Sequence, residues 1–393
     1  MSMSYLDRLL EGVKVEWKTL GEVAKFRRGS FPQPYGNSDW YDGEGAMPFV
    51  QVVDVDFDMQ LVNDTKNKIS KLAQPKSVFV PKGTIIVTLQ GSIGRVAVTQ
   101  YDCYVDRTLA IFEDYLIEIN KKYFAYQLEE KFRIEKIKAP GSTIKTITKA
   151  AFSKFKIPIP CPDNPEHSLK IQKEIVRILD TFTELTAELT AELTARKQQY
   201  EYYREELLTF GEGEVELIPL IKLAEIGTGS HDTKDAIDNG DYVFYARGKK
   251  PLRLNSYDFD ETAIITAGDG VGVGKVFHWV TGKYALHQRA YRVVPNKEEI
   301  NPRYLYHFIV AKFYDYVMKT SVHSSVTSLR KPMFQKFKIS VPSQEEQARI
   351  VSILDKFDVL TTSISEGLPK EIALRKQQYE YYRNKLLTFP KDI

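Results

Sequence analysis

The stretch "RKQQYEYYREELLTF", from Arg196 to Phe210, returns near the end of the chain as "RKQQYEYYRNKLLTF", from Arg375 to Phe389. The two copies lie 179 residues apart, and 13 of their 15 positions are identical. Self-similarity of this kind indicates a chain assembled from two related structural units. The repeat therefore decides how the rest of the sequence is interpreted. The two differences are Glu205 against Asn384 and Glu206 against Lys385.

Further matched segments extend the repeat through the chain, so that each half is a globular block, a proline-marked exit and a long helix. The opening "YLDRLL" (Tyr5 to Leu10) also echoes "YREELL" (Tyr203 to Leu208), as if the chain began inside the tail of a third copy. This is the pattern of a two-fold arrangement that closes on itself cyclically. The other pairs are "FSKFKIPIP" (Phe152 to Pro160) with "FQKFKISVP" (Phe334 to Pro342), "EIVRILDTF" (Glu174 to Phe182) with "ARIVSILDKF" (Ala348 to Phe357), and "VEWKTLGEVAKF" (Val15 to Phe26) with "VELIPLIKLAEI" (Val215 to Ile226).

Bulk properties narrow the class of protein. A chain of 393 residues is too long for one ordinary core and predicts at least two domains. It has no apolar stretch long enough to span a bilayer and no signal-peptide pattern at the N-terminus. Two cysteines, Cys103 and Cys161, make no disulfide framework, so we expect a cytoplasmic protein. The net charge is only +3, so any nucleic-acid surface must be local.

Two long helices with a heptad pattern are predicted. The first should start near Ser168 and run to about Phe210, roughly 60 Å at 1.5 Å per residue. The second should start near Gln344, and Gly367 and Pro369 should break or kink it within "EGLPKE" before it resumes. Apolar residues in steps of four and three form the expected seams. These are Ile171, Ile175, Ile178, Phe182, Leu185, Leu189 and Leu193 in the first helix, and Ile350, Ile353, Phe357, Leu360 and Ile364 in the second.

These elements predict an α+β fold. Two α/β blocks should be separated by two long antiparallel, coiled-coil-like helices, with a pseudo-two-fold internal repeat. Two independent helices on separate domains are the alternative, which we consider weaker because both helices carry heptad seams.

The segment "TAELTAEL", from Thr186 to Leu193, is a four-residue unit repeated twice. One interpretation is a low-complexity patch on a helix without a specific role. We favour an adjustable spacer, because four residues are close to one helical turn and a unit can be added or lost without breaking the helix. The spacer residues are Thr186, Leu189, Thr190 and Leu193.

In both globular blocks the sequence predicts two strands joined by a glycine turn. The first reads "GTIIVTLQGSIGRVAVTQ" (Gly83 to Gln100) and the second "ETAIITAGDGVGVGKVFHW" (Glu261 to Trp279). The second does not fit a P-loop, because Asp269 occupies a required glycine position and Val276 stands where Ser or Thr should bind magnesium. We expect a structural hairpin in each block, and we add the hypothesis that its tip points at DNA.

Basic and amide-bearing loops recur at equivalent places in both blocks. Arg and Lys read guanine edges, Gln and Asn read adenine, and Ser, Thr and Lys hold phosphates. One such charge run is more often a solvated surface, but recurrence in both halves raises the odds of function. The candidate DNA-contacting residues are Arg27, Arg28, Ser30, Gln33, Gln90, Ser92, Arg95, Arg107, Thr143 and Lys145 in the first block, and His231, Lys234, Arg247, Lys249, Lys250, Asp269, Lys275, Gln288, Arg289, Ser325, Arg330 and Lys331 in the second.

Motifs for catalysis are missing from the sequence. It contains no Asn-Pro-Pro-Tyr-type methylation motif, no Walker A motif and no cluster with metal-ligand spacing. His278 and His287 flank a strand and a turn without a paired cysteine, so we expect structural roles for them. The chain is therefore not expected to be an enzyme or to bind a metal.

Taken together, these features resemble the specificity subunit of a type I restriction–modification enzyme, over the whole chain. The resemblance is strongest in "CPDNPEHSLKIQKEIVRILDTFTELTAELTAEL", "EGLPKEIALRKQQYEYYR" and "MSYLDRLLEGVKVEW", which look like the conserved regions of the IC subgroup, whose central helix carries TAEL units. The blocks match only in outline. The domains so implied are an N-terminal helical segment (1–12), target-recognition domain 1 (13–162), a central conserved helix (163–212), target-recognition domain 2 (213–342) and a C-terminal conserved helix (343–393).

The resemblance implies a function. Each target-recognition domain would read half of a split, asymmetric site in double-stranded DNA from the major groove. The conserved helices would hold two methyltransferase subunits, and motor–nuclease subunits would join that core. S-adenosylmethionine would be bound by the partner methyltransferase, and this chain would bind no cofactor. The candidates for docking the methyltransferase, or for closing the stem, are Tyr200, Tyr202, Tyr203, Arg204, Tyr379, Tyr381, Tyr382 and Arg383.

Two alternatives stay open from the residues alone. One is a coiled-coil scaffold that binds a protein or RNA, and the other is a nonspecific nucleic-acid-binding protein. Neither explains why duplicated helices carry divergent basic loops.

Overall fold

A computed structural model describes residues 9–56, 58–138, 147–320, 328–363 and 365–389. The chain divides into two compact units. Unit 1 combines residues Met1–Glu188 with Ala373–Ile393, and unit 2 is Leu189–Ile372. Each unit therefore takes helical segments from both halves of the sequence. Thr143, Lys145, Ser325, Ile364 and the start of "YLDRLL" lie outside the described residues.

Unit 1 holds a mixed α/β domain with two four-stranded sheets, of order β2-β9-β6-β7 and β4-β3-β8-β5, and a separate antiparallel pair, β1 with β10. The predicted glycine hairpin is confirmed, because β6 and β7 pair antiparallel. The elements are β1 (Val15–Thr19), α2 (Leu20–Val23), β2 (Ala24–Arg28), β3 (Met47–Val50), β4 (Asn67–Ile69), β5 (Val78–Val80), β6 (Ile85–Thr88), β7 (Val96–Val98), β8 (Cys103–Val105), β9 (Leu109–Tyr115), α3 (Lys121–Lys138), α4 (Lys149–Ser153) and β10 (Lys156–Pro160).

Unit 2 repeats this plan with one six-stranded sheet, of order β12-β17-β15-β16-β13-β14, and the pair β11 with β18. Its glycine hairpin is also confirmed by the antiparallel pairing of β15 with β16. The elements are β11 (Glu216–Pro219), α6 (Leu220–Leu223), β12 (Ala224–Thr228), β13 (Tyr242–Tyr245), β14 (Leu252–Leu254), β15 (Phe259–Ala267), β16 (Phe277–Leu286), β17 (Ala290–Pro295), α7 (Pro302–Thr320), α8 (Lys331–Lys336) and β18 (Lys338–Val341).

Equivalent hydrogen bonds confirm that the two domains are related. Tyr123 in α3 donates its hydroxyl to the carbonyl of Pro158 at 2.9 Å, and Tyr304 in α7 donates to the carbonyl of Ser340 at 2.7 Å. In both domains this bond ties the helix to the strand that leads out of the domain. The parallel pairing of β3 with β8 likewise matches that of β13 with β16.

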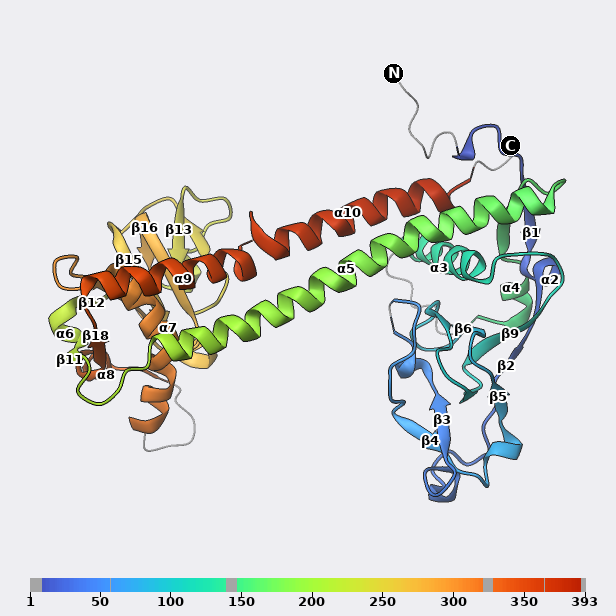
Figure 1. The fold of residues 1–393 in the computed structure, drawn as a ribbon, viewed down its shortest axis with the longest axis horizontal. Helices are drawn as coiled ribbons and strands as arrows, with labels where there is room; N and C mark the ends of the chain where they lie inside the picture. The colour runs from blue at the N-terminus through green and yellow to red at the C-terminus, as the bar shows by residue number, and fades with distance from the viewer. Residues whose placement is uncertain (1–8, 57, 139–146, 321–327, 364, 390–393) are drawn as a thin grey trace. The chain divides into compact units, whose positions relative to one another are not determined.

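The predicted long helices are present. The first, α5 (Pro165–Leu207), begins three residues before the expected start and is continuous through the TAEL units. The second is divided into α9 (Gln344–Thr362) and α10 (Gly367–Leu387). In each unit the two helical segments run antiparallel (Figure 1), as expected.

The break in the second helix depends on Gly367. Its φ of +73° lies in the left-handed region, and a Cβ atom there would lie 2.5 Å from the carbonyl oxygen of Val359. Only glycine fits this position without a clash. Pro369 follows in the first turn of α10, where its missing N–H leaves no helical hydrogen bond unmade. The break therefore lies between Thr362 and Gly367, at the start of "EGLPKE" rather than within it.

The predicted seam is buried at its start, where Ile171 and Ile175 are 2% and 0% exposed. Leu185 departs from the prediction, because its side chain is 37% exposed. The seam spacing does not explain this exposure, because Leu185 keeps the alternation of four and three, and the additional four-residue step comes only between Leu189 and Leu193.

Each copy of the repeated helix end packs on a domain. Leu386, Leu387 and Phe389 belong to the buried core of unit 1, beside Ile171 and Ile175. In unit 2, Tyr200 and Leu208 from the first copy lie in the core with Ile350 and Leu354. Among the described residues, no helix is long and apolar enough to cross a membrane.

Candidate nucleic-acid interface

Three loops of unit 2 meet at one end of its sheet. Arg247 follows β13, Asp269 follows β15, and Arg289 lies in the turn between β16 and β17. The carboxylate of Asp269 joins them, since Oδ1 accepts from Arg247 Nη1 and Oδ2 accepts from Arg289 Nη1, both at 3.0 Å. We call these three residues the Arg–Asp–Arg cluster. The sequence placed all three among the DNA candidates but gave no sign that they touch.

Glycines bring the three loops together. A Cβ atom on Gly268 would lie 2.6 Å from the carbonyl oxygen of Arg289, and one on Gly272 would lie 2.6 Å from that of Arg247. Real Cβ atoms do not approach backbone oxygens so closely. The glycine string on either side of Asp269 therefore allows its loop to pack directly against both arginine loops.

The side chain of His287 holds the turn that carries Arg289. His287 is 2% exposed, and its Nδ1 accepts from the backbone N–H of Arg289 at 2.9 Å. Burial, followed by the charge of Arg247, lowers the pKa of His287, so the ring is held neutral. Gln288 donates to Asp232 at 3.1 Å. The structural role expected for His287 fits this geometry.

The charge of Asp269 is also stabilised. Its burial would raise the pKa, but the hydrogen bonds from Arg247 and Arg289 outweigh this and bring the pKa below its ordinary value. The side chains of Arg247 and Arg289 are 43% and 64% exposed, so their outer edges face solvent. The cluster is therefore an ordered pair of guanidinium groups held by one carboxylate.

The equivalent position in unit 1 carries different side chains. The backbone bond from Gly268 to Arg289 is matched by one from Leu89 to Thr108, both at 2.8 Å, which puts Gln90 in the place of Asp269. Here the buried Asp106 accepts from the hydroxyls of Tyr35 and Thr108. The exposed Arg107 lies over the Tyr35 ring, 5.2 Å from its centroid. The scaffold is therefore shared, whereas the exposed groups differ.

Several candidate DNA-contacting residues of unit 1 instead bind other groups within the domain. Arg27 forms a 2.5 Å ion pair with Glu113 across β2 and β9. Other candidates bind backbone carbonyl groups and so act as struts within the domain. These are Arg28 to Ile147 at 2.9 Å, Ser30 to Lys76 at 3.2 Å, and Arg95 to Val55 at 3.0 Å.

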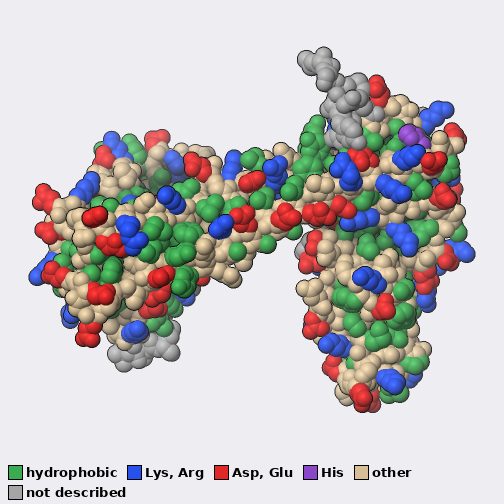
Figure 2. Space-filling model, viewed as in Figure 1, with side chains coloured by type: hydrophobic (Ala, Val, Ile, Leu, Met, Phe, Trp, Pro, Cys, Tyr) green, Lys and Arg blue, Asp and Glu red, His purple; other side chains and the backbone are tan. Residues whose placement is uncertain are grey.

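The remaining candidates lie on the two domain surfaces. Lys275 lies over the Tyr314 ring of α7, 5.0 Å from its centroid, and His231 Nε2 lies 3.0 Å from Asp258 Oδ1. Gln90 is half-buried at the end of β6. Figure 2 shows Lys and Arg mixed with Asp and Glu on the face in view, in keeping with the small net charge. The exposed candidates are Gln33, Ser92, Lys234, Lys249, Lys250, Arg330 and Lys331.

The repeated helix ends divide their aromatic residues between two environments. Tyr200 is 9% exposed and, like Tyr379, lies in or against a domain core. Tyr202 and Tyr381 are 64% and 60% exposed. Arg204 and Arg383 stack over Tyr200 and Tyr379, at 5.3 and 5.5 Å. The inward residues close the helical packing, and the outward pair presents the same aromatic group twice.

The differences between the two copies match their surroundings. Glu205 forms an ion pair with Lys312 of α7, whereas its counterpart Asn384 accepts from Arg133 of α3 at 2.9 Å. Each copy therefore carries the side chain that its own domain helix can bind. The reason for Glu206 against Lys385 is not seen in the structure.

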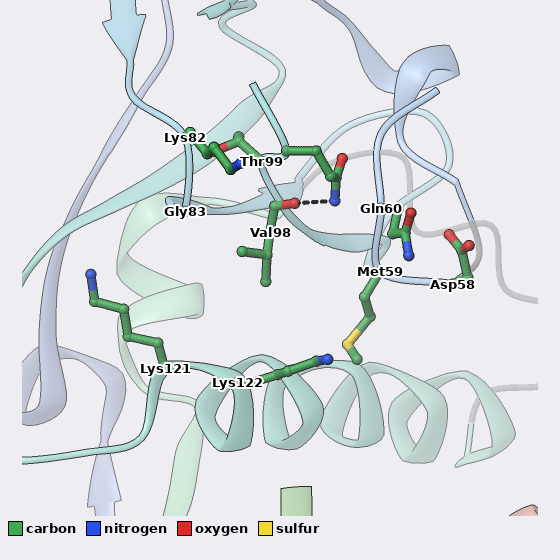
Figure 3. Close-up of a pocket in the computed structure, with 10 residues that line it drawn as sticks. Asp58, Met59, Gln60, Lys82, Gly83, Val98, Thr99, Lys121 and Lys122 are labelled. Atoms are coloured by element: carbon green, nitrogen blue, oxygen red, sulfur yellow. Dashed lines mark hydrogen bonds between the residues drawn. The ribbon is translucent and has the colours of Figure 1, made fainter. Parts of the chain in front are cut away.

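A cavity of about 420 Å³ lies beside the start of α3 in unit 1. Figure 3 shows Lys82, Val98, Met59, Lys121 and Lys122 around it. None of the DNA candidates lines this cavity. Within the described residues, no group of three or more His, Cys, Asp or Glu side chains could hold a metal ion.

Comparison with known proteins identifies the family. The family described as "Type I restriction modification DNA specificity domain" matches residues 13–196 and 212–374. The chain belongs to this family. The specificity subunit of the EcoR124I/EcoR124II type I restriction enzyme of Escherichia coli is 36% identical, over 99% of this chain and 98% of its own length. That of EcoprrI, also from Escherichia coli, is 34% identical over 93% of this chain and 92% of its own length.

Solved structures agree on the fold of this specificity-subunit family. The S subunit of the type I restriction–modification system from M. genitalium aligns with a TM-score of 0.61 and 16% identity, over 97% of this chain and 98% of its own. A chain from a structure on complex assembly and conformational transition of the type I system aligns with a TM-score of 0.60 and 14% identity, over 95% of this chain and 97% of its own. The family model and the two relatives confirm the expected resemblance to a specificity subunit, and the solved structures agree on its fold.

Proposed function

We propose that this chain directs a type I restriction–modification enzyme in the cytoplasm to a bipartite, asymmetric site in double-stranded DNA. Each domain would read one half of the site from the major groove. One observation carries the proposal: equivalent strand ends of one shared scaffold carry different polar side chains. In unit 1, Gln90 and Thr108 stand where unit 2 has Asp269 and Arg289. Different groups on one frame suit the reading of two different sequences.

The chain would also hold two methyltransferase subunits, one on each repeated helix end. Tyr202 and Tyr381 support this, because they are exposed at equivalent positions of a repeated sequence. Large exposed aromatic residues are frequent anchors of protein–protein interfaces. Tyr200, Tyr203, Tyr379 and Tyr382 pack inward and would close the stem instead.

Catalysis would belong to the partners. The methyltransferase subunits would bind S-adenosylmethionine, and motor–nuclease subunits would complete the restriction complex. The TAEL repeat in α5 supports a place in the IC subgroup, in which this segment would set the distance between half-sites.

The experiment is reconstitution of the purified chain with its methyltransferase subunit. The complex should methylate DNA at one bipartite sequence, whereas the chain alone should transfer no methyl group. Methyl transfer by the chain alone would contradict the proposal. Binding of all DNA sequences with equal affinity by the complex would favour a nonspecific nucleic-acid-binding protein.

Docking is tested by changing Tyr202 and Tyr381 to Ala, singly and together. Each single change should weaken one of the two partner sites, and the double change should weaken both, as measured by mass photometry of the complex. The matched control is Tyr257→Ala, which removes another tyrosine ring, 43% exposed, from a part of unit 2 outside the helices. Full assembly of the double variant would exclude this surface.

A further inference from the structure

The Arg–Asp–Arg cluster has a geometry suited to reading bases. Asp269 uses both carboxylate oxygens, and each arginine gives it only Nη1. Among the described residues, no carboxylate or carbonyl group takes up Nε or Nη2 of Arg247 or Arg289. Each guanidinium therefore keeps a two-donor edge, and that edge can bind the O6 and N7 acceptors of a guanine in a bidentate manner.

The carboxylate argues against a simple phosphate clamp. Asp269 carries a negative charge between the two arginines, and its lowered pKa keeps that charge at neutral pH. A phosphate held by both arginines would also lie near this carboxylate, and like charges repel. A guanine edge carries no net charge, so it meets no such penalty. The carboxylate instead fixes the direction of two long side chains that would otherwise lose much rotamer freedom on binding.

The backbone around the cluster is rigidly arranged. Gly268 and Gly272 bring the Asp269 loop into contact with the carbonyl groups of Arg289 and Arg247. His287 anchors the Arg289 turn from below. The three loops thus hold both guanidinium groups before DNA arrives, which is the condition for discrimination between bases.

We propose that the half-site of the second domain contains guanine, that Arg247 and Arg289 read it, and that Asp269 is the residue that positions both arginines. This deepens the proposed function and rests on it. Domain 1 has Gln90 and Thr108 at the positions of Asp269 and Arg289, so the same cluster cannot form there. The two half-sites should therefore differ in how guanine is read.

The test begins by mapping the sites methylated by the wild-type complex. If no specific site exists, the proposed function fails. If a site exists, its second half should contain guanine, and replacing that base by 7-deazaguanine, which lacks the N7 acceptor, should weaken binding roughly tenfold. Second-half sequences without guanine on either strand would overturn the inference alone.

Substitutions then connect the base to the cluster. Arg289→Ala and Arg247→Ala should each reduce discrimination at a guanine on the order of tenfold to a hundredfold. In the arginine variant that loses the contact, 7-deazaguanine should cause no further loss. Asp269→Asn keeps the size of the side chain but removes its charge, which weakens its bonds to both arginines. Discrimination should therefore fall several-fold at the same bases.

The control is Asp260→Asn, an exposed carboxylate at the other end of β15, which should leave discrimination unchanged. A purely structural role for Asp269 would lower affinity for all sequences together and leave the 7-deazaguanine effect in place. A phosphate clamp would do the same and also reduce the salt dependence of binding. Either result would overturn the inference.

Discussion

The ring of Tyr382 stacks on the ring of Phe182, with centroids 5.0 Å apart, and Tyr203 meets Phe357 in the equivalent way, with centroids 5.7 Å apart. In both pairs the tyrosine comes from a repeated helix end and the phenylalanine from the helix that leaves a domain. The tyrosine of the second copy completes unit 1, although the sequence places it beyond domain 2. The duplication thus gives each domain the same closing contact.

This contact predicts that two neighbouring tyrosines contribute differently to the free energy of unfolding. Tyr382→Ala removes a half-buried stacked ring and should lower the free energy of unfolding of unit 1 by about 2 kcal/mol. Tyr381→Ala removes a ring that is 60% exposed and should change it by less than about 0.5 kcal/mol. Urea unfolding followed by a probe in unit 1 measures both. Equal losses for the two variants would contradict the packing described here.

A half-buried ion cluster in unit 2 predicts acid sensitivity. Asp355 Oδ1 lies 2.7 Å from His307 Nε2 and 3.0 Å from Arg303 Nε. Burial acts to raise the pKa of Asp355, but the bonds from His307 and Arg303 lower it to about 2. A carboxyl group with a depressed folded pKa stabilises the fold above its unfolded value near 4 and loses this contribution as pH falls toward 2.

The difference in unfolding free energy between the wild-type chain and Asp355→Asn should therefore be full above about pH 4 and shrink as pH falls toward 2. Denaturant unfolding at several pH values, with a probe in unit 2, measures it. A difference that stays constant from pH 6 to pH 2 would show that the ionised carboxylate contributes nothing.

The TAEL segment predicts the spacing of the two half-sites. One added unit lengthens α5 by four residues, or roughly 6 Å. A base pair rises about 3.4 Å, so the spacer could grow by at most about two pairs. We expect part of the added length to be lost, because the far half-site also turns by roughly 35° with each added pair. We predict growth by one pair with both half-sites unchanged. Mapping of methylated sites would contradict the spacer hypothesis if the spacing stayed the same.

The sequence predicted the features that repeat or follow a period. The copies at Arg196 and Arg375 and the heptad residues from Ile171 and Ile350 predicted the internal repeat and the two long helices, and Gly367 predicted a break close to where it occurs. Contacts between residues that are distant in the sequence produce no repeat or period and could not be predicted in this way. Asp269 lies 22 residues from Arg247, and nothing in the string "AGDGVGVG" shows that its glycines touch arginine carbonyl groups.

Basic character alone also could not distinguish arginines that face solvent from arginines that bind groups inside the domain. Arg28 and Arg95 stand beside turns and carry the same charge as Arg107, yet the first two bind carbonyl groups inside the domain. Which role an arginine takes depends on the loop that folds over it. The pattern of residues therefore supplied candidates for an interface, and the structure separates the exposed candidates from those that bind groups inside the domain.

The proposed function requires that the two domains read separate parts of one site independently. It is tested most directly by mapping genome-wide the sites methylated by the complex that contains the wild-type chain, Arg247→Ala or Lys275→Ala. We predict a wild-type site of two specific parts separated by unspecific bases, with each variant relaxing or weakening recognition in the same single part. Changed bases in both parts, or one continuous recognised block, would contradict the account.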